Sequence, residues 1–306
     1  MAADRSVLTT RDAVARRLRG GGTDWRGSVL EGALLLSLLV SLGVLLVLVS
    51  DTIMKALPVL LDRPGDFLAS RVSARPERAG ILQAIIGSVT ITLIVAALAI
   101  PAGIGAAIYL EEYARDTRLS RFIRTNIRNL AGVPAIVYGL LGLAVFSTAL
   151  GLGSTLLAGG LTLAVLVLPI AVITASEALS AVPGAIREAA YGVGATRWET
   201  IRSHVLPYAA PGILTGVILS LARAFGETAP LLMVGAIAGT FSFVGPPWEQ
   251  LSEGYTTLPT IVYHWAGYPQ PEFRALGAAA IVVLLGVILL ANATAILLRN
   301  RYDRRW

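Results

Sequence analysis

Six long apolar runs constrain this chain more than any other feature. They occupy residues 32–50, 83–109, 130–150, 155–175, 209–238 and 276–297. About 20 apolar residues let a helix cross the hydrocarbon core of a bilayer, and a helix satisfies its own backbone groups there. The chain is 55% hydrophobic and only 14% charged, whereas about a quarter of a soluble domain is charged. The sequence therefore predicts an all-α polytopic membrane protein with six transmembrane helices.

The distribution of basic residues predicts the orientation of these helices. If the N-terminus is inside, eighteen of the 25 Lys and Arg residues lie on the inner side, six lie outside, and Arg223 lies within a span. Basic residues accumulate on the cytoplasmic side of membrane proteins. We therefore expect cytoplasmic tails at 1–31 and 299–306 around a transmembrane permease domain at 32–298. The first tail is too long and polar for a usual signal peptide, and its segment 11–19 fits an amphipathic surface helix or a disordered tail.

Composition and motifs also argue against several kinds of chemistry. The absence of cysteine excludes disulfides and thiolate ligands, and two distant histidines make a poor case for a metal site, so none is expected. Lys55 is the only lysine, and no phosphate-binding Gly-x-x-x-x-Gly-Lys-Ser/Thr loop occurs. The chain is thus expected to bind no ATP or other cofactor and to be no enzyme. Its net charge of +6 follows the membrane topology, so no nucleic-acid partner is expected.

Two outer segments, 51–82 and 239–275, are longer than simple connections require. The second is rich in proline and in aromatic residues, namely Trp248, Tyr255, Tyr263, Trp265 and Tyr268. Such aromatics form interfacial belts in many membrane proteins. The length of the segment favours the alternative, an ordered surface that meets a partner through residues such as Trp265 and Tyr268.

Prolines within or beside the spans predict kinked helices. Pro101, Pro134 and Pro169 each remove a backbone hydrogen bond, which a membrane helix tolerates where it packs against protein or lines a cavity. Pro134 and nearby Tyr138 are therefore candidates for a hinge or a translocation pathway. Ordinary kinking and packing explain them equally well.

A charged pair is predicted inside the fifth apolar run. Arg223 lies 14 residues beyond the start of that run, about 21 Å along a helix and hence near the middle of the membrane. A charge at that depth is costly and needs a partner. Glu227, one helical turn later, can supply it. The pair either fixes helix packing or forms an anion site, in which the guanidinium binds phosphate-type oxygens and the hydroxyl of Thr228 adds a donor.

The segment 177–208 is polar, although it lies between two apolar runs. It reads as a helix-turn-helix suited to a soluble partner rather than to lipid. Its triplet Glu188-Ala189-Ala190 is followed after three residues by Gly194 and later by Leu206-Pro207. This spacing resembles the Glu-Ala-Ala coupling loop of bacterial ABC-importer permeases, although His204 stands where that family usually has an aliphatic residue. The resemblance implies that an ATPase is contacted by Glu188, Ala189, Ala190, Gly194, Ala195, Thr196, Leu206 and Pro207.

Further stretches resemble one family of permeases, the A-type (PstA) permeases of bacterial phosphate importers. These stretches are 67–81, 103–110, 131–139, 223–230 and 257–265. The resemblance implies the type I ABC-importer permease fold, with five core helices and a peripheral first helix, in the bacterial cytoplasmic membrane. It also implies import of inorganic phosphate by alternating access. The implied partners are a sister permease (PstC-like), two ATPase subunits (PstB-like) that use ATP and Mg, and an extracytoplasmic phosphate-binding protein (PstS-like).

Other functions remain open at this point. The chain could be a permease for another oxyanion, such as sulfate or molybdate, or a membrane signalling subunit that reports phosphate status. An anion channel is disfavoured, because a passive pore does not require a coupling loop.

Overall fold

The computed structural model describes residues 25–237 and 247–302, and within these ranges it contains helices but no strand. Five helices are long and apolar enough to cross a membrane, and a sixth span results if one bent helix pair is counted. The predicted all-α membrane fold is therefore confirmed. Most of the predicted N-terminal tail, the end of the C-terminal tail and part of the second outer segment lie outside the described residues.

The chain divides into two units, 1–51 and 52–306, and helix α2 (Trp25–Asp62) contributes to both. In the first unit, α2 contains the predicted span 32–50, and its leucine and valine side chains are exposed. An apolar helix surface of this kind suits lipid or another membrane subunit. In the second unit, Ala56 of the same helix is fully buried.

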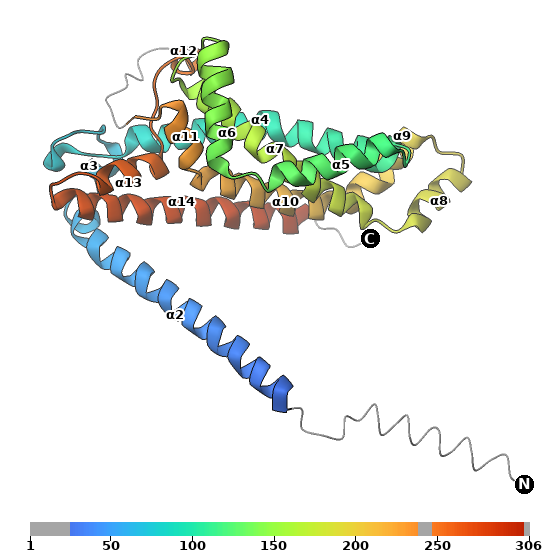
Figure 1. Cartoon of the computed structure of the whole chain (residues 1–306), viewed down its shortest axis with the longest axis horizontal. Coiled ribbons are helices and arrows are strands. Elements are labelled where there is room, and N and C mark those ends of the chain that lie inside the picture. Colours follow the sequence, from blue (N-terminus) through green and yellow to red (C-terminus); the bar gives the residue numbers. More distant parts are fainter. Residues whose placement is uncertain (1–24, 238–246, 303–306) are drawn as a thin grey trace, which may run out of the picture. The chain divides into compact units, whose positions relative to one another are not determined.

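Four long helices of the second unit lie side by side, namely α4 (Leu82–Ile108), α7 (Leu156–Ser180), α10 (Leu206–Gly226) and α14 (Glu272–Tyr302) (Figure 1). Small residues bring their backbones close together. A Cβ atom added at Gly103 of α4 would lie 2.7 Å from the Cβ of Ala171 on α7. Close approach through small residues is typical of membrane helices, where packing rather than the hydrophobic effect holds helices together.

The third predicted span is bent rather than straight. Helix α5 (Arg118–Ala131) and the segment formed by α6 (Ala135–Gly142) and the π-helix η3 (Leu143–Ala149) meet at 98°. Gly132 ends α5 and Pro134 is the N-cap of α6. A proline disfavours helical backbone in the residue before it, which explains the break. The expectation of one span over 130–150 was therefore wrong at its start.

The fifth predicted span, 209–238, is also broken. Helix α10 ends at Gly226, and the short helix α11 (Ala229–Val234) begins after Glu227 and Thr228. Pro230 lies at the start of α11, where it cannot donate to the carbonyls of α10. Gly235 then ends α11 with a φ of 99°, in the left-handed region that favours glycine. Arg223 consequently lies in the last turn of α10 and not in the middle of a continuous helix.

The outer segments fold into a layer at one end of the bundle (Figure 1). This layer contains α3 (Pro64–Ala69), the 3₁₀ turn η1 (Pro76–Arg78), α12 (Pro247–Gln250) and α13 (Leu258–Ala266). Its core includes Phe67, Trp265 and Phe273, with ring centroids 6.4 Å apart for the first pair and 6.0 Å for the second. The expectation that Trp265 faces a partner was wrong, because its side chain is 0% exposed.

The opposite end of the bundle carries short helices (Figure 1). These are α8 (Gly184–Gly192) and α9 (Arg197–Thr200), followed by the π-helix η4 (Ile201–Val205) that leads into α10. Another π-helix, η2 (Tyr109–Tyr113), ends α4 nearby. The polar segment and the outer layer thus lie at opposite ends of the second unit.

Candidate functional site: the polar helix-turn-helix and the charged helix end

The predicted helix-turn-helix is present as α8, a tight turn and α9. Pro183 is the N-cap of α8, and Gly194 has a φ of 87°, which residues with a side chain rarely adopt. The turn is closed by the amide of Gly194, which donates to the carbonyl of Tyr191 (3.0 Å), and by the amide of Ala195, which donates to that of Ala190 (3.0 Å). A Cβ at Gly194 would meet no atom within 4 Å, so backbone conformation rather than crowding requires glycine there.

Thr196 has a structural role that the sequence analysis missed. Its hydroxyl accepts a hydrogen bond from the amide of Glu199 (3.3 Å), and the Glu199 carboxylate accepts from the amide of Thr196 (2.8 Å) and from its hydroxyl (2.7 Å). The bonds from Thr196, first from its side chain and then from its backbone, lower the pKa of Glu199. This is a capping box, and its Thr-x-x-Glu pattern was visible in the sequence.

A buried ion pair fixes α8 to the end of α4. The guanidinium of Arg187 donates to the carboxylate of Glu112 on η2, with Nη2–Oε1 at 2.6 Å and Nε within 3.2 Å of both oxygens. The same guanidinium donates to the carbonyl of Leu179 (3.0 Å), in the last turn of α7, and to that of Val182 (2.9 Å), just beyond the helix. Glu112 is only 4% exposed, and its hydrogen bond raises the pKa of Arg187. Two-pronged pairing of this kind is strong and directional.

A second contact ties α9 to the same helix end. The guanidinium of Arg197 lies 5.0 Å from the ring centroid of Tyr113, a cation–π geometry. Sequence analysis did not single out Glu112 or Tyr113, which lie 75 and 84 residues from their partners. Local spacing carries no signal for such long-range pairs.

The remaining predicted coupling residues differ in exposure. Glu188, Ala189 and Pro207 are exposed, Leu206 and Ala195 are half-buried, and Ala190 is buried against the rest of the protein. Apolar side chains also reach the surface of this otherwise polar segment. They are Tyr191, Val193, Trp198 and Tyr208, and Val193 is 85% exposed. Tyr191 and Val193 lie outside the helices that are long enough to span a membrane, so the segment presents apolar surface there.

The predicted pair of Arg223 and Glu227 forms at the end of α10. The Arg223 Nε atom lies 3.3 Å from Glu227 Oε1, and the side chains are 55% and 17% exposed. The position of Arg223 in the last turn is favourable, because a helix C-terminus attracts cations. Thr228 follows at the N-cap of α11, and its side chain makes no capping hydrogen bond. The pair lies 17 residues beyond Leu206, so roughly 25 Å of helix separates it from the start of α10.

Tyr138 braces the bend in the third span. Its hydroxyl donates to the carbonyl of Leu130 at 2.9 Å, across the break that Pro134 introduces. The ring is buried and packs in the core that includes Leu231 of α11. This bond explains Tyr138 as a support of the bend. A hinge or pathway role for Tyr138 and Pro134 stays a prediction.

The helical bundle, with a polar helix-turn-helix at one end and a folded layer at the other, has the architecture of a type I ABC-importer permease. A bacterial alginate ABC transporter, crystallised with an alginate pentasaccharide-bound periplasmic protein, shares this fold. The match has a TM-score of 0.66 and 16% identity and covers 88% of this chain and 93% of that one.

The chain belongs to the family of binding-protein-dependent transport system inner membrane components, whose model matches residues 99–305. It is 33% identical over 239 residues to the probable ABC transporter permease protein YqgI of Bacillus subtilis (strain 168), covering 75% of this chain and 81% of that protein. It is 32% identical over 249 residues to the phosphate transport system permease protein PstA 1 of Mycobacterium tuberculosis (strain CDC 1551 / Oshkosh), covering 80% and 79%. The chain is therefore a multi-pass inner-membrane permease subunit.

Proposed function

We propose that this chain is the A-type permease subunit of an ATP-driven importer that carries inorganic phosphate into the cytoplasm by alternating access. The proposal rests on the similarity to the mycobacterial phosphate permease and on one observation, the rigid helix-turn-helix with exposed apolar side chains. Exposed apolar side chains outside a membrane span favour a protein contact. The chain supplies the path, and a pair of PstB-like ATPase subunits supplies the energy.

Phosphate uptake is the direct test of this function. A strain that lacks its own phosphate permeases is complemented with the complete four-component system, and uptake of radiolabelled phosphate is measured. We expect phosphate uptake to be reduced by excess unlabelled phosphate and by arsenate. Sulfate and molybdate should leave it unchanged. Competition by sulfate or molybdate, with no phosphate uptake, would assign the chain to another oxyanion. A response of phosphate-regulated genes without any uptake would assign it to signalling.

The helix-turn-helix is proposed to dock on the ATPase. Val193 is the best site for a crosslinking cysteine, because it is 85% exposed, whereas Thr196 is engaged in the capping box. The chain has no cysteine of its own. We expect Val193→Cys to crosslink to a cysteine in the groove of the ATPase subunit. Tyr263→Cys, in the outer layer at the other end of the bundle, serves as the control and should not crosslink. A purified, intact complex in which Val193→Cys fails to crosslink would contradict docking.

The charged end of α10 is proposed to bind phosphate during passage. Broken helices line substrate sites in many transporters, and α10 and α11 are such a pair. Arg223 offers a planar guanidinium, which matches phosphate oxygens in two-pronged fashion. Glu227 balances its charge when no anion is present and prevents retention of the anion, and the Thr228 hydroxyl adds a donor. Residues of a PstC-like sister permease complete the site.

A further inference from the structure

The π-helix η2 ends α4 with two adjacent carboxylates that serve different neighbours. In helical backbone, successive side chains point in different directions around the helix axis. Glu112 consequently reaches Arg187 on α8, whereas Glu111 reaches Arg124 on α5. One turn of backbone thus joins the helix-turn-helix to the start of the bent third span.

The contact through Glu112 is tight and shielded from water. The carboxylate is 4% exposed, and the guanidinium of Arg187 also donates to the carbonyls of Leu179 and Val182 at the end of α7 and just beyond it. Removing one partner of a buried ion pair leaves an unpaired buried charge, which is strongly unfavourable. A displacement of α8 is therefore transmitted to η2 rather than absorbed at this joint.

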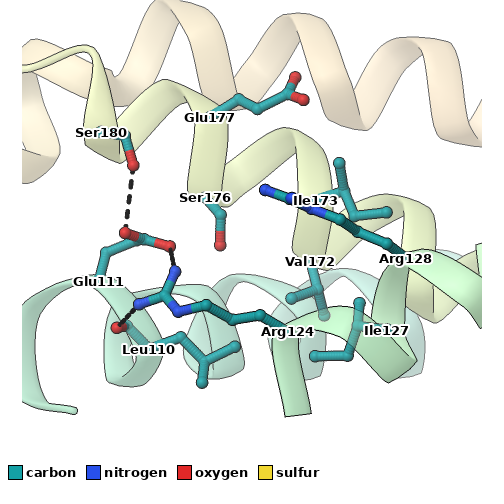
Figure 2. A pocket seen from close by; sticks show the side chains of 10 residues that line it. All are labelled: Leu110, Glu111, Arg124, Ile127, Arg128, Val172, Ile173, Ser176, Glu177 and Ser180. Carbon is teal, nitrogen blue, oxygen red and sulfur yellow. Dashed lines mark hydrogen bonds and ion pairs between the residues drawn. The ribbon is translucent and has the colours of Figure 1, made fainter. Parts of the chain in front are cut away.

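The contact through Glu111 continues the connection to α5. Figure 2 shows the Arg124 guanidinium donating to the Glu111 carboxylate and to the carbonyl of Leu110. The hydroxyl of Ser180, at the end of α7, donates to the other Glu111 oxygen at 3.1 Å. The residues of this network line a cavity of about 240 Å³ between α5 and α7, together with others that include Ile127 and Ile173. Because a cavity lacks the close packing of a protein interior, α5 has room to move there.

Helix α5 leads to the proposed substrate site through two packed joints. The bend that Tyr138 braces connects it to α6, and α6 packs on α11. A Cβ at Gly139 of α6 would lie 2.7 Å from the Cα of Pro230, so the two helices are in close backbone contact. Pro230 is three residues from Glu227. Movement of α5 therefore reaches the segment that holds the ion pair.

We propose that Glu111 and Glu112 are positioning residues that transmit movement of the helix-turn-helix to α5 and thence to the substrate site. This inference rests on the proposed function, since it requires an ATPase that moves the loop. It adds a second route to the covalent one, in which α9, η4 and α10 form a continuous helical stretch from Arg197 to Gly226. The covalent route reaches Arg223 along α10. The carboxylate route reaches α11 through its contact with α6.

The test measures the α5–α7 distance across the cavity. Spin labels are attached to Ile127→Cys and Ile173→Cys in a full complex whose partner subunits lack reactive cysteines, and distances are measured with and without ATP trapping. We expect ATP to change this distance. In Glu111→Gln and Glu112→Gln the change disappears and phosphate uptake falls at least tenfold, while ATP hydrolysis continues and the Val193→Cys crosslink still forms. The swapped pair Glu112→Arg with Arg187→Glu should regain part of both responses.

Asp116→Asn is the matched control. Asp116 pairs with Arg121 of α5 at 3.3 Å, but the pair is exposed and contributes little. We expect wild-type distances and uptake for this variant. The proposal is overturned if ATP leaves the wild-type distance unchanged, or if the Gln variants keep the full change. It is also overturned if these variants lose the crosslink, because the carboxylates then only shape the loop. If Val193→Cys fails to crosslink when Glu111 and Glu112 are intact, the result counts instead against docking of the helix-turn-helix on the ATPase.

Discussion

At the scale of single residues, Arg223 carries the most specific expectation. Its side chain is 55% exposed in the isolated chain although it lies in the last turn of a long apolar helix. Among the described residues, Arg223 makes one side-chain hydrogen bond, at Nε, so most of its five N–H groups are available there for a further ligand. If Arg223 only paired with Glu227, these additional N–H donors would not be needed.

Substitutions separate an anion-binding role of Arg223 from a packing role. We expect Arg223→Ala to abolish phosphate uptake while the complex assembles and hydrolyses ATP. Arg223→Lys should restore little uptake, because an ammonium lacks the planar two-pronged geometry. The double change Arg223→Gln with Glu227→Gln should also stay inactive. Full uptake in the double variant would show that the residues only neutralise each other. Radiolabelled phosphate uptake, normalised to purified complex, is the measurement.

The two ion pairs also show what sequence reasoning reaches at this scale. The pair of Arg223 and Glu227 follows from i,i+4 spacing, and the positive φ of Gly194 agrees with the glycine predicted in the turn. The pair of Arg187 and Glu112 has no such signal, because 75 residues separate its members. Whether a given carboxylate meets a given arginine then depends on how α4, α7 and α8 pack, which helical periodicity does not determine.

At the scale of elements, breaks in helices were harder to predict than the helices themselves. Hydropathy located α2, α4, α7 and α14, because an apolar run of sufficient length permits little else in lipid. Hydropathy merged α10 with α11, because the residues on both sides of Glu227 and Thr228, at 224–226 and 229–233, are apolar or small. Prolines lie at both breaks, Pro134 and Pro230, but only Pro134 was among the prolines that the sequence analysis considered. A proline alone does not predict a break, because Pro101 and Pro169 lie inside continuous helices.

Helix α13 shows the same limit for aromatic residues. Leu258, Ile261 and Trp265 share one face at helical spacing and are fully buried, whereas Tyr263 lies on the other face and is 61% exposed. The abundance of aromatics suggested a partner-facing surface, but only their periodicity distinguishes core from surface.

A paired substitution tests this division of α13. We expect Trp265→Ala to destabilise the outer layer by about 3–5 kcal/mol, the usual cost of emptying a buried aromatic site. Tyr263→Ala should leave the melting temperature almost unchanged but weaken the stimulation of ATP hydrolysis by the loaded binding protein. Thermal unfolding and ATPase rates of the purified complex provide the two readouts. If Tyr263→Ala leaves stimulation intact, the exposed ring belongs to an interfacial aromatic belt.

At the scale of the whole molecule, the arrangement of the second unit agrees with its charge distribution. The outer layer and the helix-turn-helix lie at opposite ends of one bundle, and α14 runs between these ends (Figure 1). The basic residues Arg187, Arg197 and Arg202 lie at the helix-turn-helix end. By the positive-inside rule, we predict that this end faces the cytoplasm. The proposed contact of the helix-turn-helix with an ATPase requires the same orientation.

Labelling of single cysteines tests this orientation directly. Val193 and Tyr263 are both well exposed and lie at opposite ends of the second unit, and the chain is otherwise free of cysteine. A membrane-impermeant maleimide should label Tyr263→Cys in intact spheroplasts. It should label Val193→Cys only in inside-out vesicles, and there only when the ATPase subunits have been stripped, because docking covers that site. Protection of Val193→Cys on adding the ATPase back would tie orientation and docking together. The reverse pattern of labelling would place the helix-turn-helix outside the cell, where no ATP-driven mechanism could use it.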